Sequence, residues 1–121
     1  MAVTFYKLKE GNKLWKIDIQ RDENNAMTGY ICRNLEMARD ASIENYRVRF
    51  ICYDRTLNKN TMFVYDVGYN DCNHKEYIKD ENENDILKSY LTTSKKTADI
   101  FCKDLDKELG ITDGKETGQD D

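Results

Sequence analysis

The sequence predicts an α+β fold in which an antiparallel sheet of about five strands is covered on one face by C-terminal helix. Two observations predict it. Apolar and polar residues alternate through most of the first two-thirds of the chain, as in half-buried strands. After residue 86 the apolar residues recur every three or four positions, as along an amphipathic helix. With 121 residues we expect one domain over residues 1–111 and a disordered polar tail over 112–121.

The first two segments are predicted to form a β-hairpin. Residues 3–10 and 13–21 alternate in polarity, and Gly11-Asn12 between them is typical of a tight turn because both residues tolerate positive φ. In the second segment the two faces of the strand differ in polarity. The apolar residues Trp15, Ile17 and Ile19 share one face, and the polar residues Lys16, Asp18 and Gln20 point to water on the other.

Three more strands follow in the prediction, with polar loops or turns between them. The three strands are predicted at residues 26–33, 46–55 and 61–69. A loop at 22–25 precedes the first of them, a turn at 58–60 joins the second to the third, and a loop at 70–76 follows the third. Residues 34–45 have two interpretations. Asn34 could begin a short helix as its cap, or the preceding strand could continue.

The C-terminal third is predicted to be one long helix or two shorter ones. Its apolar stripe is Leu87, Leu91, Ser94, Ala98, Phe101, Leu105 and Leu109. Ser94 could cap a second helix, because its hydroxyl can accept a free backbone N–H. Gly110 is placed for a left-handed C-terminal cap.

Composition restricts the function. The net charge of -4 does not favour general nucleic-acid binding, which needs a concentrated basic face. No apolar run is long enough for a bilayer, and the N-terminus lacks the run of a signal peptide. We therefore expect no membrane interaction and a cytoplasmic location, which is the host cytosol if a phage encodes the protein.

No catalytic or metal-binding motif is recognisable. The four cysteines, Cys32, Cys52, Cys72 and Cys102, are far apart and form no C-x-x-C pair, and the chain has one histidine. Cys72 and His74 are near neighbours in a predicted loop, where a thiol and its base rarely face each other correctly. We therefore assign no catalytic residue, metal or cofactor, and expect no enzyme.

The segment 46–55 carries the main hypothesis for ligand binding. Strand alternation places Arg47, Arg49, Tyr53 and Arg55 on one face. Arginine forks bind phosphate or carboxylate, and an aromatic ring such as that of Tyr53 or Trp15 stacks on a flat ligand. The alternative is a solvated sheet face whose arginines pair with acids on neighbouring strands.

A second hypothesis concerns an acidic segment, residues 80–85. Its charges precede the predicted helix, where they favour the positive end of the helix dipole. Alternatively, Glu81, Glu83 and Asp85 form an acidic patch that binds a basic partner.

The overall layout resembles small counter-defence proteins of phages and mobile elements. An N-terminal antiparallel sheet, an arginine- and aromatic-rich strand at 47–55 and a C-terminal helix are similar to the layout of the Thoeris anti-defence sponges, although no specific motif is shared. That resemblance implies a protein that counteracts host defence. The sponges sequester cyclic nucleotide signals in pockets of an oligomer.

Three classes of function remain open. The first is a non-enzymatic protein that binds and inhibits a host protein through the acidic segment or an exposed sheet edge. The second binds a small phosphorylated or nucleotide ligand through Arg47, Arg49 and Arg55 with Tyr53 or Trp15, and the third is a small enzyme with an unfamiliar site. Unprotected edge strands, in a chain without proline, are also compatible with a homodimer or higher homo-oligomer.

Overall fold

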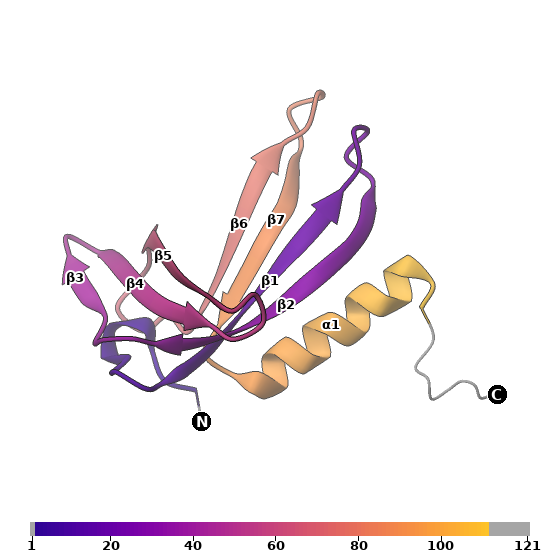
Figure 1. Ribbon diagram of the computed structural model, residues 1–121. Helices are drawn as coiled ribbons and strands as arrows, with labels where there is room; N and C mark the ends of the chain where they lie inside the picture. The colour runs from indigo at the N-terminus through magenta and orange to yellow at the C-terminus, as the bar shows by residue number, and fades with distance from the viewer. Residues whose placement is uncertain (1, 112–121) are drawn as a thin grey trace.

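The α+β class is confirmed, but the sheet is larger than predicted. A computed structural model describes residues 2–111, which form a curled antiparallel sheet of seven strands followed by one helix (Figure 1). The elements are a 3-10 helix (Phe5–Lys7), β1 (Lys13–Arg21), β2 (Met27–Met37), β3 (Ser42–Glu44), β4 (Arg47–Asp54), β5 (Lys59–Asp66), β6 (Asn73–Lys79), β7 (Asp85–Thr92) and α1 (Lys95–Leu109).

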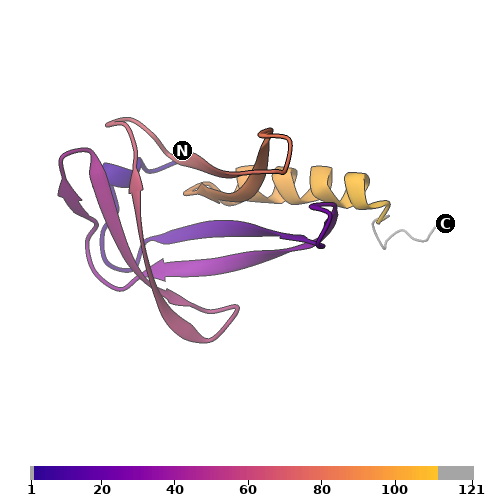
Figure 2. The same ribbon diagram turned by 90° about the horizontal axis from the view of Figure 1, so that it is seen from above.

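The strands are arranged in the order β3-β4-β2-β1-β7-β6, and β5 pairs with β4 outside this path. One edge of β4 pairs with β5 over its whole length, and its other edge is shared between β2 and β3. Seen from above, the β4–β5 hairpin crosses the long β1–β2 hairpin at a steep angle (Figure 2). The sheet therefore has a concave face, where β4 and β5 lie over the start of β1.

Two apolar clusters lie on opposite faces of the central strands. On the concave face Phe5, Leu14, Phe50 and Leu91 are buried with their neighbours. On the other face α1 packs against β1, β2 and β7 (Figure 1) and buries Ile17. The expectation that helix covers one face of the sheet is confirmed for these three strands.

The prediction of helix from residue 86 was wrong, because residues 85–92 form β7. Tyr90 is buried on the face of α1, whereas Leu91 is buried on the concave face. A strand covered on both faces is a nearly continuous apolar run, and its spacing cannot be distinguished from that of a short helix. The helix begins where Ser94 caps it, with the Ser94 hydroxyl accepting the Thr97 N–H at 3.2 Å, and Gly110 is the left-handed cap (φ 76°).

The predicted strand at 3–10 was also wrong, because this segment contains the 3-10 helix. Phe5 and Leu8 are three residues apart and both are buried in the concave-face cluster, a spacing that suits a turn of helix. Gly11 does adopt positive φ (87°), but its N–H donates to the Met37 carbonyl at 2.8 Å. The turn therefore leads the chain into β1 beside the end of β2, and forms no hairpin.

Three other predicted segments differ from the structure only in their bounds or in part of their length. Of the two interpretations of residues 34–45, the continuing strand is right as far as Met37, and β3 follows. The expected loop at 70–76 contains the start of β6. The turn predicted at 58–60 lies earlier, at residues 55–58, where Asn58 has a φ of 55°, and residues 59 and 60 already belong to β5.

None of the helices in residues 2–111 has the length and apolar character that crossing a membrane requires. The predicted tail, 112–121, lies outside the described residues.

Candidate functional site

The predicted alternation of β4 is confirmed. Val48, Phe50 and Cys52 are buried on the concave face, and Arg47 and Arg49 are exposed on the opposite face. Burial raises the pKa of the Cys52 thiol to about 12, so this thiol stays protonated at neutral pH.

The two arginines have different surroundings. Arg47 lies opposite Asp66 of β5, and its Nε donates to the Asp66 carboxylate at 3.3 Å. Arg49 lies opposite Val64 of β5 and makes no ion pair with any residue between 2 and 111. The solvated-face alternative therefore describes Arg47, while Arg49 keeps its hydrogen-bond donors available.

Apolar side chains adjoin these arginines on the same surface. Met62 (60% exposed) lies opposite Ile51, and Val64 (37% exposed) lies opposite Arg49. We call this surface the outer face; it consists of Arg47, Arg49, Ile51, Met62 and Val64. In the part of the chain that the structure describes, the far edge of β5 pairs with no other strand.

Exposed apolar side chains are concentrated in the segment of the chain from residue 43 to residue 69, which includes the outer face. Six of the eleven large apolar side chains that are exposed among residues 2–111 lie between residues 43 and 69: Ile43, Tyr46, Leu57, Met62, Val64 and Tyr69. Only Met62 and Val64 of these six belong to the outer face, since Ile43 lies opposite Val48 on the other side of the sheet and Tyr69 packs on Tyr6. Because large exposed apolar groups beside polar ones can mark interaction sites, Met62 and Val64 beside Arg49 make the outer face a candidate interaction surface.

Arg55 does not belong to the same site as Arg47. It follows the end of β4, roughly 27 Å along the strand from Arg47 at about 3.4 Å per residue. Its Nε and Nη2 donate to one carboxylate oxygen of Glu36 at 3.1 and 2.8 Å, and its guanidinium lies 5.8 Å from the centre of the Tyr53 ring. The Tyr53 hydroxyl donates to the Asn58 side chain. The five predicted ligand-binding residues are therefore divided between two places.

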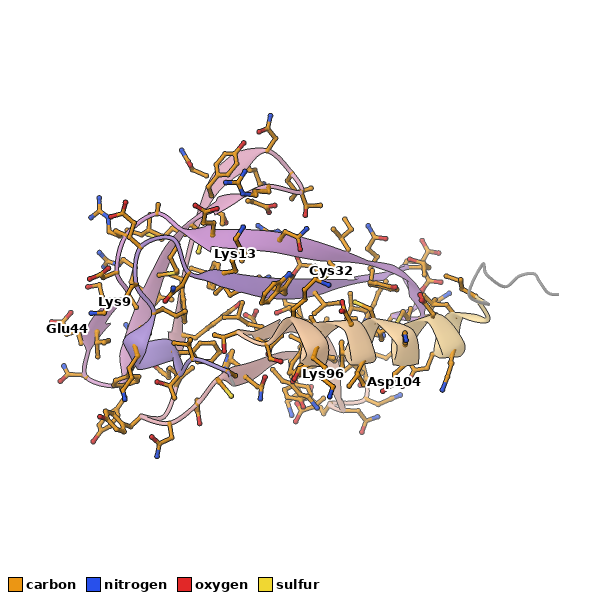
Figure 3. The ribbon with its side chains drawn as sticks, turned by 90° about the horizontal axis from the view of Figure 1, so that it is seen from below. Lys9, Lys13, Cys32, Glu44, Lys96 and Asp104 are labelled. Atoms are coloured by element: carbon orange, nitrogen blue, oxygen red, sulfur yellow. The ribbon has the colours of Figure 1, made fainter. Side chains whose placement is uncertain are left out.

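The structure does bring Trp15 and Arg55 together. They line a pocket of about 330 Å³ at the start of α1, which we call the Trp15 pocket. The full lining is Lys13, Trp15, Asn34, Leu35, Arg55 and Lys95. Figure 3 views the side of the sheet on which α1 lies, with Lys13 labelled at the start of β1 and Lys96 in the first turn of α1.

The Trp15 pocket is rich in positive charge. Its lining holds Lys13, Arg55 and Lys95, and none of the carboxylates among the described residues belongs to it. Glu36 lies beside Arg55 and Lys13, and its pKa is held below its usual value by the hydrogen bond from Arg55 and by the charges of Arg55 and Lys13. Lys13 could have been predicted, since alternation places it on the face of Trp15, but Lys95 joins only through the packing of α1.

A buried ionic network on the concave face was not predicted from the sequence. Arg33 donates to Asp54 at 2.6 Å and to Asp18 at 2.8 Å, and Lys16 lies 2.5 Å from Asp18. The prediction that Lys16 faces water was wrong, because β4 and β5 cover this end of the concave face. Asp54 also accepts the Leu57 N–H at 2.9 Å. Since these charges satisfy one another, the network is structural.

The acidic segment lies at the tip of the β6–β7 hairpin, far from α1 in Figure 1. The helix-dipole interpretation is therefore wrong, because the helix begins at Lys95. Asp80 shapes the turn by accepting the N–H groups of residues 82 and 84. Glu81 and Glu83 are exposed, and Asp85 pairs with Lys79 at 2.9 Å.

His74 is part of the concave-face packing. Its ring packs against the Tyr65 ring with a centroid separation of 4.3 Å and a tilt of 31° between the planes, and burial lowers the pKa of the imidazole. Cys72 precedes β6, and its sulfur contacts the neighbouring Asn73 amide at 3.6 Å. The structure records no contact between Cys72 and His74 that would make them a nucleophile and its base.

Comparison with known proteins found no match to this chain. No protein-family model matches the chain, and neither curated proteins nor solved structures contain a match.

Proposed function

We propose that the protein is a non-enzymatic binding protein that docks a partner protein on its outer face and along the free edge of β5. The observation that carries this proposal is the exposure of Met62 and Val64 beside Arg49. Methionine, arginine and aromatic residues are enriched at protein interfaces. Complete burial of a fully exposed methionine or valine side chain is worth about 1.5–3 kcal/mol, and burial of the parts of Met62 and Val64 that are exposed contributes a fraction of that value.

The geometry suggests the kind of segment that binds. An edge strand presents unpaired N–H and C=O groups, and an extended partner segment can add to it as a further strand. Such a segment needs an apolar side chain over Met62 and Val64 and a carboxylate within reach of Arg49. Inhibition of a host protein, the role implied by the resemblance to counter-defence proteins, is the form of binding that we propose.

A second candidate surface is the acidic tip of the β6–β7 hairpin. Its carboxylates, at Glu81 and Glu83, are exposed and take no part in capping a helix. A partner bound there would be basic, and the complex would weaken as salt is added because exposed charges are screened.

The experiment compares two substitutions of exposed apolar residues by lysine. Met62→Lys places a charge on the outer face, and Tyr77→Lys does the same on β6, where the wild-type side chain is 51% exposed. Each tagged variant is used for affinity capture from the cells in which the protein is naturally made. We expect a partner that is retained by the wild-type chain and by Tyr77→Lys and is lost from Met62→Lys.

A third variant separates the two surfaces. Glu81→Gln combined with Glu83→Gln removes the charge of the acidic tip and leaves the outer face unchanged. If this variant loses the partner while Met62→Lys keeps it, the outer-face proposal is wrong and the acidic tip is the docking site. Circular dichroism of each variant establishes that the fold is retained.

A further inference from the structure

We infer that the Trp15 pocket is a second binding site, which accepts a nucleoside monophosphate: its base lies against Trp15, and its phosphate lies among Lys13, Arg55 and Lys95. The pocket is separate from the outer face, since its residues come from the ends of β1, β2 and β4 and the start of α1. A flat ring and a nearby group of cations are the two features that a nucleotide requires of a site.

The indole of Trp15 is held by the surrounding fold. Trp15 lies opposite Asn34 of β2 and Thr92 of β7, so hydrogen-bonded strands fix its backbone on both sides. Its side chain packs against the cluster that includes Ile17 beneath α1 and remains only partly buried. The indole is therefore positioned before a ligand arrives, which reduces the entropic cost of stacking.

The cations retain capacity for a phosphate. Arg55 uses Nε and Nη2 for Glu36, and its Nη1 donates to no residue within the described range 2–111. Lys13 Nζ is 3.7 Å from the Glu36 carboxylate, which is longer than a hydrogen bond. Lys95 pairs with the exposed Asp99 at 3.1 Å, one turn further along α1 and outside the pocket lining. Each cation can therefore turn a donor toward an oxyanion.

Size and comparison with other hollows favour a single nucleotide here. A volume of about 330 Å³ is at the lower end of the range for small-molecule sites, about 300–1,000 Å³. A larger hollow of about 540 Å³ is lined by Asp106, and no cation among residues 2–111 lines it. Another, of about 420 Å³, contains Asp104 and Glu108, and its Arg21 already donates to the Leu87 carbonyl. Carboxylates in these two hollows would repel a phosphate.

Trp15 supplies the readout, because it is the only tryptophan in the chain. The purified protein is titrated with AMP, GMP, CMP and UMP, with excitation at the red edge of tryptophan absorption, where nucleotides absorb little. Adenosine and inorganic phosphate are titrated separately as the two halves of the ligand. We expect at least one mononucleotide to give saturable quenching, and adenosine and phosphate alone to bind at least tenfold more weakly.

Matched variants connect the signal to the site. Arg55→Ala and Lys95→Ala each remove one cation from an exposed position, and each should weaken mononucleotide binding about tenfold or more, as expected for a charge-assisted hydrogen bond. Lys103→Ala removes an exposed lysine further along α1, outside the pocket lining, and this variant should bind mononucleotides like the wild type. Circular dichroism confirms that all three variants fold.

Three results would overturn the inference. The first is the absence of saturable quenching with all four mononucleotides. The second is unchanged affinity in both Arg55→Ala and Lys95→Ala. The third is a single-stranded oligonucleotide that binds more tightly than any mononucleotide, which would point to nucleic acid as the ligand. Partner capture by Arg55→Ala, measured in parallel, reports on the outer face independently.

Discussion

At the scale of single residues, Arg33 and Asp54 show how the fold accommodates charge in its interior. Burial alone would raise the pKa of Asp54, but the Leu57 N–H and the Arg33 guanidinium outweigh it and hold the pKa below its usual value. Asp54 thereby serves two purposes. Its Oδ1 accepts the N–H groups of the two residues that shape the turn after β4, and its Oδ2 accepts the Nε–H of Arg33 on β2.

Replacing Asp54 tests this arrangement. Asp54→Asn leaves Arg33 buried with one carboxylate fewer, and we expect a loss of about 3 kcal/mol in the free energy of unfolding at neutral pH. Because the pKa of Asp54 is lower in the folded state, its contribution is complete above about pH 4 and is lost as pH falls below that value. Urea denaturation of wild type and variant near pH 7 and about pH 3 measures both effects.

The matched control is Asp66→Asn on β5. It removes the carboxylate that pairs with the exposed Arg47, and it should leave stability nearly unchanged because exposed pairs contribute little. Equal losses in the two variants, or a loss for Asp54→Asn that stays constant from neutral pH to about pH 3, would contradict the assigned role.

At the scale of elements, local signals were sufficient for α1 and insufficient for β7. The start and end of α1 are encoded by Ser94 and Gly110, whose cap geometry depends on their own backbone and on adjacent turns. β7 is a strand because it pairs with β1 and β6 and because both its faces are covered. β6 is its hairpin partner, but β1 is distant in sequence, and burial on both faces removes the alternation that would have revealed the strand.

The cap at Ser94 carries the prediction at this scale. Ser94→Ala removes the oxygen that accepts the Thr97 N–H, and we expect a loss of about 1 kcal/mol in the free energy of unfolding. Thermal or urea denaturation followed by far-ultraviolet circular dichroism measures it. Ser94→Asp restores an acceptor and should recover most of the loss. A loss of the same size in Ser94→Asp would mean that the hydroxyl acts in another way.

The candidate site, like the secondary structure, could be predicted only where the signal is local to one strand. Alternation correctly assigned Arg47 and Arg49 to an exposed face, because side-chain direction in a strand is a local property. Which side chains meet depends on register and curvature. Arg55 therefore joins Trp15 through the pairing of β2 with both β1 and β4, whereas it lies far from Arg47 on its own strand.

At the scale of the whole molecule, the curl of the sheet brings two strands that do not pair into contact. β5 and β6 belong to different ends of the strand order, yet the Tyr65 hydroxyl donates to the Glu76 carboxylate at 3.1 Å. The Ser89 hydroxyl donates to the same oxygen at 3.1 Å, and the His74 ring packs against the Tyr65 ring. This contact holds the β4–β5 hairpin over the concave face and so fixes the orientation of the outer face.

Tyr65→Phe tests whether that contact stabilises the curl. The ring and its packing on His74 remain, so the change removes one hydrogen bond to a partly buried carboxylate, and we expect unfolding to become easier by about 1–2 kcal/mol. Tyr69→Phe is the matched control, since the Tyr69 side chain is exposed and its hydroxyl bonds to no described residue. Amide exchange should rise in β5 and β6 of Tyr65→Phe before it rises in β1, because β1 is covered on both faces. If exchange rose equally in all strands, or if the two variants were equally stable, the curl would depend on apolar packing alone and the Tyr65–Glu76 contact would be incidental.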